Sequence, residues 1–146
     1  MTDIDRFLER FAAFGANPDP VLYEDLFDPA DGTVLHPGME APLHRDKVRD
    51  YMTLFLATIQ EFHFDIVRSA TDGETVFVEA ANRGVIGGAR LEWGTIYRIV
   101  LRADRVLAGR AYGDRVPLLA RLSPTMTLAE AAGMGSVAPG LATPAD

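Results

Sequence analysis

The chain has 146 residues, of which 48% are hydrophobic and 24% charged, and it contains no cysteine. This length suffices for one globular domain with its own core, and the lack of cysteine excludes disulfides, thiolate zinc sites and thiol nucleophiles. The formal net charge of −7 disfavours binding to nucleic acid or to an anionic membrane, because both require clustered Lys and Arg.

No run of about 18 apolar residues is present, so we expect no membrane-spanning segment. The first residues lack the basic start and the apolar run of a signal peptide, and we therefore expect a cytoplasmic location.

The N-terminal part predicts helices. Residues 2–14 carry apolar side chains three and four positions apart from Ile4 to Phe11, which places them on one helical face. Thr2 or Asp3 can cap this helix and Gly15 can end it. A second, shorter helix is predicted over 21–27.

A short strand over 33–36, ended by Pro37-Gly38, precedes the strongest helical signal, at 45–61. One face of that helix is apolar, and its members are Val48, Tyr51, Met52, Phe55, Leu56 and Ile59.

From residue 62 onward, apolar residues recur at every second position, which is typical of strands. The predicted strands start at residue 62 and cover 75–86, 89–101 and 105–113. The fold class is therefore α+β, with one curved antiparallel sheet and helices on one face.

Gly87-Gly88 predicts a tight hairpin turn, which sets a pairing register. With these two residues as the loop, position i pairs with position 175 − i. The interior face then carries four pairs: Gly84 with Leu91, Asn82 with Trp93, Ala80 with Thr95, and Val78 with Tyr97. An apolar surface with a few polar groups is typical of a small-molecule pocket.

The inward face of the last strand depends on the loop before it. A three-residue loop over 102–104, with Asp104 left-handed, points Ala111 and Gly113 inward. A two-residue loop instead points Arg110, Tyr112 and Asp114 inward. We favour the first arrangement.

The element order and three short segments resemble the SnoaL-like branch of the nuclear transport factor 2-like superfamily. The segments are 36–39 (His-Pro-Gly-Met), 44–46 (His-Arg-Asp) and 110–114 (Arg-Ala-Tyr-Gly-Asp). That superfamily includes polyketide cyclases, ketosteroid isomerase and limonene epoxide hydrolase. The resemblance implies a cone-shaped half-barrel, in which the curved sheet wraps around the long helix beside two N-terminal helices. It also implies a pocket inside the cone and homodimers formed through the outer sheet face. We expect a domain over 1–122 and an Ala/Gly/Pro-rich tail over 123–146.

The chain departs from limonene epoxide hydrolases at three positions that the resemblance aligns. Those enzymes have Arg and Asp where this chain has Ala80 and Asn82, and they have a second Asp where this chain has Ala111. In SnoaL-like relatives, a pair of residues at the strand end positions water, and the resemblance places this pair at Val34 and His36. Of these two residues only His36 is polar. Epoxide hydrolysis is therefore disfavoured, and so is ketosteroid isomerase chemistry, because the central strands have no inward carboxylate.

Three residues are predicted to carry catalysis. His36 can give or take a proton near neutral pH, unless it only caps the turn that follows it. Asn82 can orient a ligand carbonyl or a water molecule, unless it only bonds neighbouring backbone or Tyr97. Tyr97 can donate to an oxyanion. The predicted ligand-binding residues are Tyr23, Val34, Met39, Ala80, Trp93, Thr95 and Ala111.

His36, His44 and His63 have no metal-ligand spacing, so we expect no metal, and we expect no other cofactor. Asp114 is expected to be structural. The predicted function is cyclisation, isomerisation or dehydration of an apolar carbonyl compound by proton transfer alone. Two alternatives stay open: a ligand-binding protein without chemistry, or a structural dimer with a cavity too small for any ligand.

Overall fold

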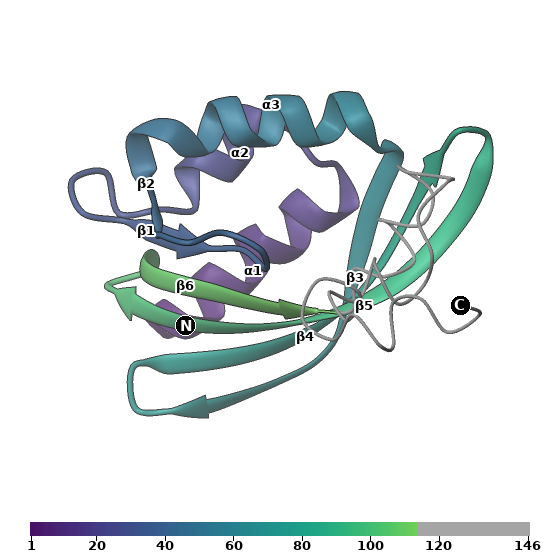
Figure 1. The fold of residues 1–146 in the computed structure, drawn as a ribbon. Coiled ribbons are helices and arrows are strands. Elements are labelled where there is room, and N and C mark those ends of the chain that lie inside the picture. Colours follow the sequence, from purple (N-terminus) through teal and green to yellow (C-terminus); the bar gives the residue numbers. More distant parts are fainter. Residues whose placement is uncertain (114–146) are drawn as a thin grey trace, which may run out of the picture.

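Three helices, six strands and one 3-10 turn make up residues 1–113, the part of the chain that the computed structural model describes (Figure 1). The helices are α1 (Asp3–Ala16), α2 (Pro20–Asp25) and α3 (Val48–Thr58), and the 3-10 turn is Arg45–Lys47. The strands are β1 (Thr33–Leu35), β2 (Leu43–His44), β3 (Gln60–Asp72), β4 (Thr75–Ile86), β5 (Ala89–Arg102) and β6 (Arg105–Gly113). The predicted α+β class is confirmed. Asp114 and the tail over 123–146 lie outside the described residues.

Helix α1 begins as predicted and ends later. Thr2 accepts from the Asp5 N–H while the Asp5 carboxylate accepts from the Thr2 N–H, which is a capping box. The prediction that Gly15 ends the helix was wrong, because the helix continues to Ala16. Gly15 instead allows close packing, since a Cβ there would lie 2.7 Å from the Phe64 carbonyl oxygen of β3.

The strong helical signal at 45–61 corresponds to the 3-10 turn followed by α3. His44 caps the turn, and its Nδ1 accepts from the Asp46 N–H. The predicted apolar face is confirmed, because Val48, Met52 and Ile59 are buried and the other three members of that face are packed against the core.

The sheet has the strand order β2-β1-β6-β5-β4-β3. The predicted hairpin register is confirmed, with Asn82 opposite Trp93 and Ala80 opposite Thr95. Gly87 and Gly88 both have positive φ, as the tight hairpin turn requires. Strand β1 pairs with β6 in parallel, an addition to the predicted antiparallel sheet, and β2 was not predicted.

The last strand has the favoured inward face for a different reason than the one predicted. Arg102 pairs with Arg105, so the loop has two residues, and Ala103, not Asp104, has positive φ. The predicted three-residue loop was wrong. A bulge restores the parity, because Leu101 pairs with Val106 while Val100 pairs with Ala108, which leaves Leu107 as an extra residue. Ala111 is therefore buried.

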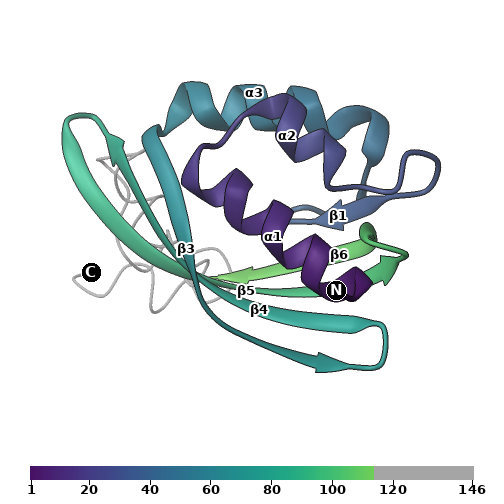
Figure 2. The same cartoon turned by 180° about the vertical axis from the view of Figure 1, so that it is seen from behind.

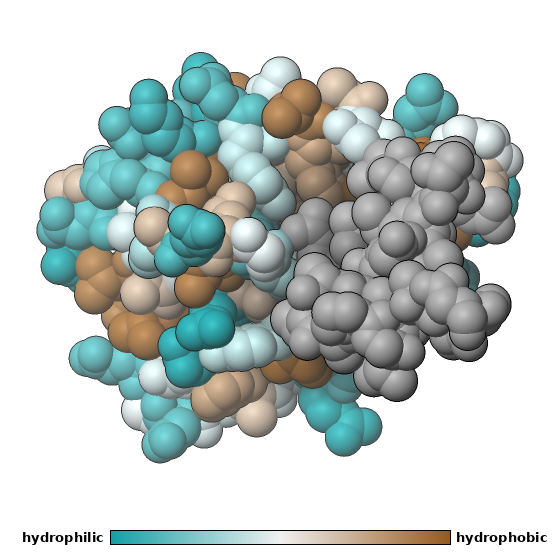
Figure 3. Space-filling view, viewed as in Figure 1, coloured by the Kyte–Doolittle hydropathy of each residue, from teal (hydrophilic) through white to brown (hydrophobic). Residues whose placement is uncertain are grey.

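The curved sheet holds α1 against its concave face, and α3 lies across the open side next to α2 (Figures 1 and 2). Phenylalanines from α1 meet Phe64 of β3 there and fill much of the core. On the face shown in Figure 3, apolar residues are interspersed among hydrophilic ones. Within residues 1–113, none of the helices has the length and apolar character needed to cross a bilayer.

Candidate functional site

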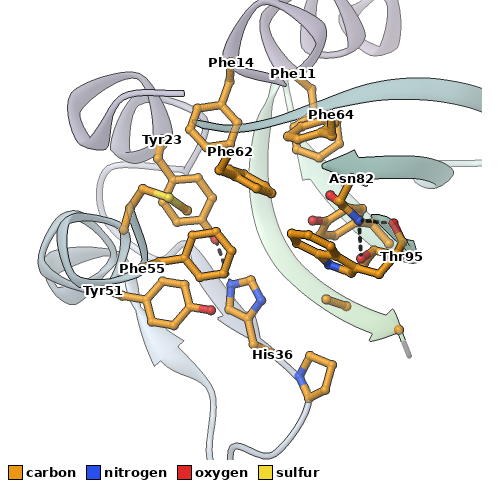
Figure 4. Close-up of a pocket in the computed structure, with 16 residues that line it drawn as sticks. Phe11, Phe14, Tyr23, His36, Tyr51, Phe55, Phe62, Phe64, Asn82 and Thr95 are labelled. Carbon is orange, nitrogen blue, oxygen red and sulfur yellow. Dashed lines mark hydrogen bonds between the residues drawn. The ribbon is translucent and has the colours of Figure 1, made fainter. Parts of the chain in front are cut away.

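A cavity lies between the helices and the concave face of the sheet (Figure 4). Its volume is about 70 Å³, and the space reaches about 660 Å³ when the open solvent at its mouth is included. Every helix and four of the six strands contribute lining. The lining residues are Phe11, Phe14, Tyr23, His36, Pro37, Tyr51, Met52, Phe55, Phe62, Phe64, Asn82, Trp93, Thr95, Tyr97, Ala111 and Gly113.

His36 and Tyr23 form a hydrogen-bonded pair on one side of this cavity. The Tyr23 hydroxyl and His36 Nε2 are 2.9 Å apart. The Tyr51 ring stacks on the imidazole, with centroids 4.6 Å apart and planes 17° from parallel. His36 directly follows β1, Tyr23 comes from α2 and Tyr51 from α3, so three separate elements hold the imidazole plane and one of its nitrogens.

The Tyr23 and Tyr97 hydroxyls in the cavity stay protonated at neutral pH. Burial raises the pKa of Tyr23 well above its ordinary value, and proximity to Tyr51 and Tyr97 raises it further. Burial also raises the pKa of Tyr97, with a smaller contribution from Tyr51, while the hydrogen bond with Thr95 acts in the opposite direction. Both side chains therefore present neutral hydroxyls, which can donate to a ligand oxygen or accept from a ligand hydroxyl.

Asn82 and Thr95 form the second polar group of the cavity, across from His36 (Figure 4). The Asn82 side chain is buried, and its Nδ2 donates to the Trp93 carbonyl oxygen and to Thr95 Oγ1, both at 3.0 Å. Both amide N–H groups are thus used inside the sheet. The interpretation that Asn82 only bonds its neighbours accounts for its donors, and no N–H remains to hold a ligand carbonyl.

Among the described residues, the lining contains no Asp, Glu, Lys or Arg. Ala80, Asn82 and Ala111 all lie on the inner side of the sheet, at the positions where the resemblance to epoxide hydrolases requires charged groups. Within residues 1–113, no three His, Asp or Glu side chains are grouped so that they could hold a metal ion.

Seven of the ten predicted site residues line the cavity together, and their roles stay predictions. They are Tyr23, His36, Asn82, Trp93, Thr95, Tyr97 and Ala111. In the described structure, the other three are not part of the lining. Val34 is buried in the core opposite Gly109, Ala80 is buried between β3 and β5, and Met39 lies in the turn after β1.

Apart from Tyr23 of α2, the helical part of the lining was missed as a site. Phe11, Tyr51 and Phe55 belong to helical apolar faces that sequence periodicity assigns to the core, and periodicity does not distinguish core from cavity. The available signal was the number of aromatic residues on these faces, which exceeds what a plain aliphatic core needs.

A family model for the SnoaL-like domain matches residues 4–108. The chain belongs to the SnoaL-like domain family. The match ends five residues before the last described residue, so it spans nearly all of the described fold. Among curated proteins, none matches the sequence.

Solved structures share this SnoaL-like fold. A protein from Catenulispora acidiphila with a ketosteroid isomerase-like fold, in complex with trimethylamine, is 22% identical with a TM-score of 0.70, over 79% of this chain and 90% of that one. IdmH from Streptomyces antibioticus, a proposed polyketide cyclase, is 17% identical with a TM-score of 0.67, over 81% of this chain and 96% of that one. A proposed SnoaL-like polyketide cyclase from Jannaschia sp. CCS1 is 10% identical with a TM-score of 0.68, over 84% and 94%. At these identities the likeness shows the fold alone.

Proposed function

We propose that this SnoaL-like protein binds a small, largely apolar carbonyl compound in the cavity and moves a proton on it through His36. The observation that carries the proposal is the 2.9 Å contact between the Tyr23 hydroxyl and His36 Nε2 inside an aromatic lining. An imidazole whose plane and one nitrogen are held by neighbours is the usual arrangement of a general acid or base.

The Tyr23 contact relates the tautomer of His36 to the direction of this hydrogen bond. When Nε2 carries the proton and donates it to the Tyr23 oxygen, the basic lone pair lies on Nδ1. When the Tyr23 hydroxyl donates to Nε2, the proton lies on Nδ1, which then acts as the acid.

Tyr97 is the neutral donor that would hold the ligand oxygen, and Trp93 would form a flat wall against the ligand. Cyclisation, isomerisation and dehydration all include such a proton transfer next to a carbonyl. IdmH and the Jannaschia protein, both described as proposed polyketide cyclases, support this class of substrate.

Exchange of α-protons for deuterium tests the proposal without knowledge of the product. Small ketones and enones are first screened for thermal stabilisation, since a ligand at about 100 times its Kd adds about 2.7 kcal/mol. NMR in D2O then follows the α-protons of each bound compound. His36→Phe keeps the stacking on Tyr51 and is expected to slow exchange by roughly 100- to 10,000-fold.

His63→Phe is the matched control, because His63 is only partly buried, bonds the Glu61 carbonyl and is not part of the cavity lining within the described residues. Exchange should be unchanged in it. Equal exchange rates in His36→Phe and the wild type would remove His36 from the mechanism.

The small cavity favours a second function, a structural protein whose interior is filled by its own side chains. One water molecule needs roughly 10–15 Å³ and drug-sized pockets have roughly 300–1,000 Å³, whereas the enclosed part here is about 70 Å³. If no compound in the screen stabilises the protein, this second function is favoured.

We also propose a homodimer formed through the outer face of the sheet, in the cytoplasm. Phe77, Ile96 and Tyr112 lie on three adjacent strands of that face and are 39%, 42% and 42% exposed. Ile96 pairs directly with Tyr112, so the apolar surface is continuous across β5 and β6. Ile96→Glu should convert a dimer to a monomer in sedimentation analysis, and a wild type that is already monomeric would refute the interface.

A further inference from the structure

The orientation of the Asn82 amide determines what this residue can offer a ligand. Its Nδ2 lies 3.0 Å from the Trp93 carbonyl oxygen, and a carbonyl oxygen only accepts hydrogen bonds. The nitrogen must therefore face Trp93, and the same nitrogen also bonds Thr95. The Oδ1 atom then points the other way, toward the cavity (Figure 4).

The Asn82 oxygen has no hydrogen-bond donor among the described residues. The side chain is only 2% exposed, and the residues that line the cavity beside it are mainly aromatic. The buried side-chain atoms without a partner in residues 1–113 are Arg10 Nε and Arg45 Nε, and the Asn82 oxygen is not one of them, so a small molecule in the cavity can reach it. A ligand that brings a donor to this oxygen gains a hydrogen bond, whereas a ligand carbonyl would place a second acceptor against it.

The charge of the lining decides between a neutral donor and a cation. The described lining residues include no Asp or Glu that could serve as a counter-charge for an ammonium group. Aromatic rings attract cations, but a hydroxyl group needs no such compensation.

We propose that Asn82 determines the specificity of the cavity by accepting a hydrogen bond from a neutral hydroxyl group of the ligand. The substrate is then a hydroxy compound with a flat apolar body, which matches the narrow aromatic space. This inference rests on the proposed function only in that both use the same cavity. It narrows the substrate class from any apolar carbonyl compound to one that also bears a hydroxyl.

Binding of four small probes to the wild-type protein tests the inference. Phenol and toluene have nearly the same shape and differ in the donor, benzaldehyde carries only an acceptor, and trimethylammonium is the cationic probe. We expect phenol to bind at least about tenfold more tightly than toluene or benzaldehyde, because only phenol can donate a hydrogen bond to the Asn82 oxygen.

NMR of the side-chain amides locates the contact. The chain contains only two asparagines, Asn17 and Asn82, and one glutamine, Gln60, so the signals are easily assigned. Phenol should shift the Asn82 amide signals and leave those of Asn17 unchanged. Asn82→Leu should lose the preference for phenol while still binding toluene, and the wild-type measurements decide the matter if this variant does not fold.

The possible failures are distinguishable. If phenol and toluene bind equally, or if the preference persists in Asn82→Leu, the role of Asn82 is refuted while the cavity remains a ligand site. Tighter binding of trimethylammonium than of phenol would refute the neutral hydroxyl. If no probe binds, both this inference and the proposed function fail.

Discussion

Replacing Asn82 by aspartate tests the described amide orientation, because it changes shape very little. The substitution exchanges the NH2 group for an oxygen, which in an ionised carboxylate would face the Trp93 carbonyl oxygen at about 3.0 Å with no hydrogen between them. The position is 2% exposed, so water cannot solvate an ionised carboxylate there. The folded variant will therefore hold its carboxyl group protonated.

The magnitude follows from burial. Full burial raises the pKa of a carboxyl group by about 3–5 units above its ordinary value near 3.9. The loss is about 1.4 kcal/mol for each pH unit above the unfolded-state pKa until the folded-state pKa is reached, so Asn82→Asp should lose about 4 kcal/mol of unfolding free energy at pH 7. Because the pKa is higher in the folded state than in the unfolded state, this loss is absent below about pH 4. It grows by about 1.4 kcal/mol per pH unit until the pH passes the folded-state pKa.

Urea denaturation followed by circular dichroism between pH 4 and pH 8 measures this difference against the wild type. Asn17→Asp is the matched control, because Asn17 is exposed at the end of α1 and its substitution should give a nearly pH-independent change. A deficit of less than about 1 kcal/mol at pH 7, or one that does not change with pH, would refute the reasoning. Asn82 would then not use both N–H groups inside the sheet, and the acceptor proposed for the ligand would lose its basis.

Three further predictions follow from other contacts. Gly15→Ala should destabilise the fold by about 1–3 kcal/mol in urea denaturation, because the new Cβ would meet Phe64 of β3 at 2.7 Å. This loss outweighs a gain in helix propensity of about 1 kcal/mol. An unchanged or increased stability would contradict the packing described for Gly15. The pKa values of Tyr23 and Tyr97 are raised in the folded state, so the unfolding free energy should fall as the pH rises above about 10, by about 1.4 kcal/mol per unit for each, and Tyr23→Phe should remove one such contribution. Tyrosinate absorbance near pH 10 that is present in the folded wild type and missing in Tyr23→Phe would count against the burial of Tyr23. The pKa of His44 is raised by its hydrogen bond to Asp46, so His44 should titrate above its ordinary value in NMR and return toward it in Asp46→Asn.

The central hairpin could be predicted residue by residue, because two adjacent glycines fixed its loop and left no freedom in the register. Gly87 and Gly88 both have the positive φ that a two-residue turn needs, and every pair from Thr75 to Ile86 follows from that turn. The Asn82–Trp93 and Ala80–Thr95 pairs were therefore accessible before any coordinates.

Other parts depend on contacts between distant segments. The parallel pairing of β1 with β6 joins residues more than seventy positions apart, and a three-residue strand carries too little pattern to reveal its partner. The Tyr23–His36 bond likewise requires α2 to lie beside the end of β1, which the local sequence does not specify. His36 and Tyr23 were each predicted as site residues, but their hydrogen bond was not.

The bulge at Leu107 shows how a single residue of backbone decides the chemistry of the cavity. A two-residue loop with regular pairing would point Arg110 and Tyr112 inward, toward the concave side of the sheet. The extra residue reverses the last part of β6, so that Arg110 lies outside over the Tyr112 ring, with the guanidinium carbon 5.0 Å from its centroid, and Ala111 lies inside. The lining that residues 1–113 provide then consists of neutral and apolar side chains together with His36. The imidazole, the phenols and the Asn82 oxygen are donors and acceptors in this lining, and for this reason we assign the proton transfer to His36 and the choice of ligand to Asn82.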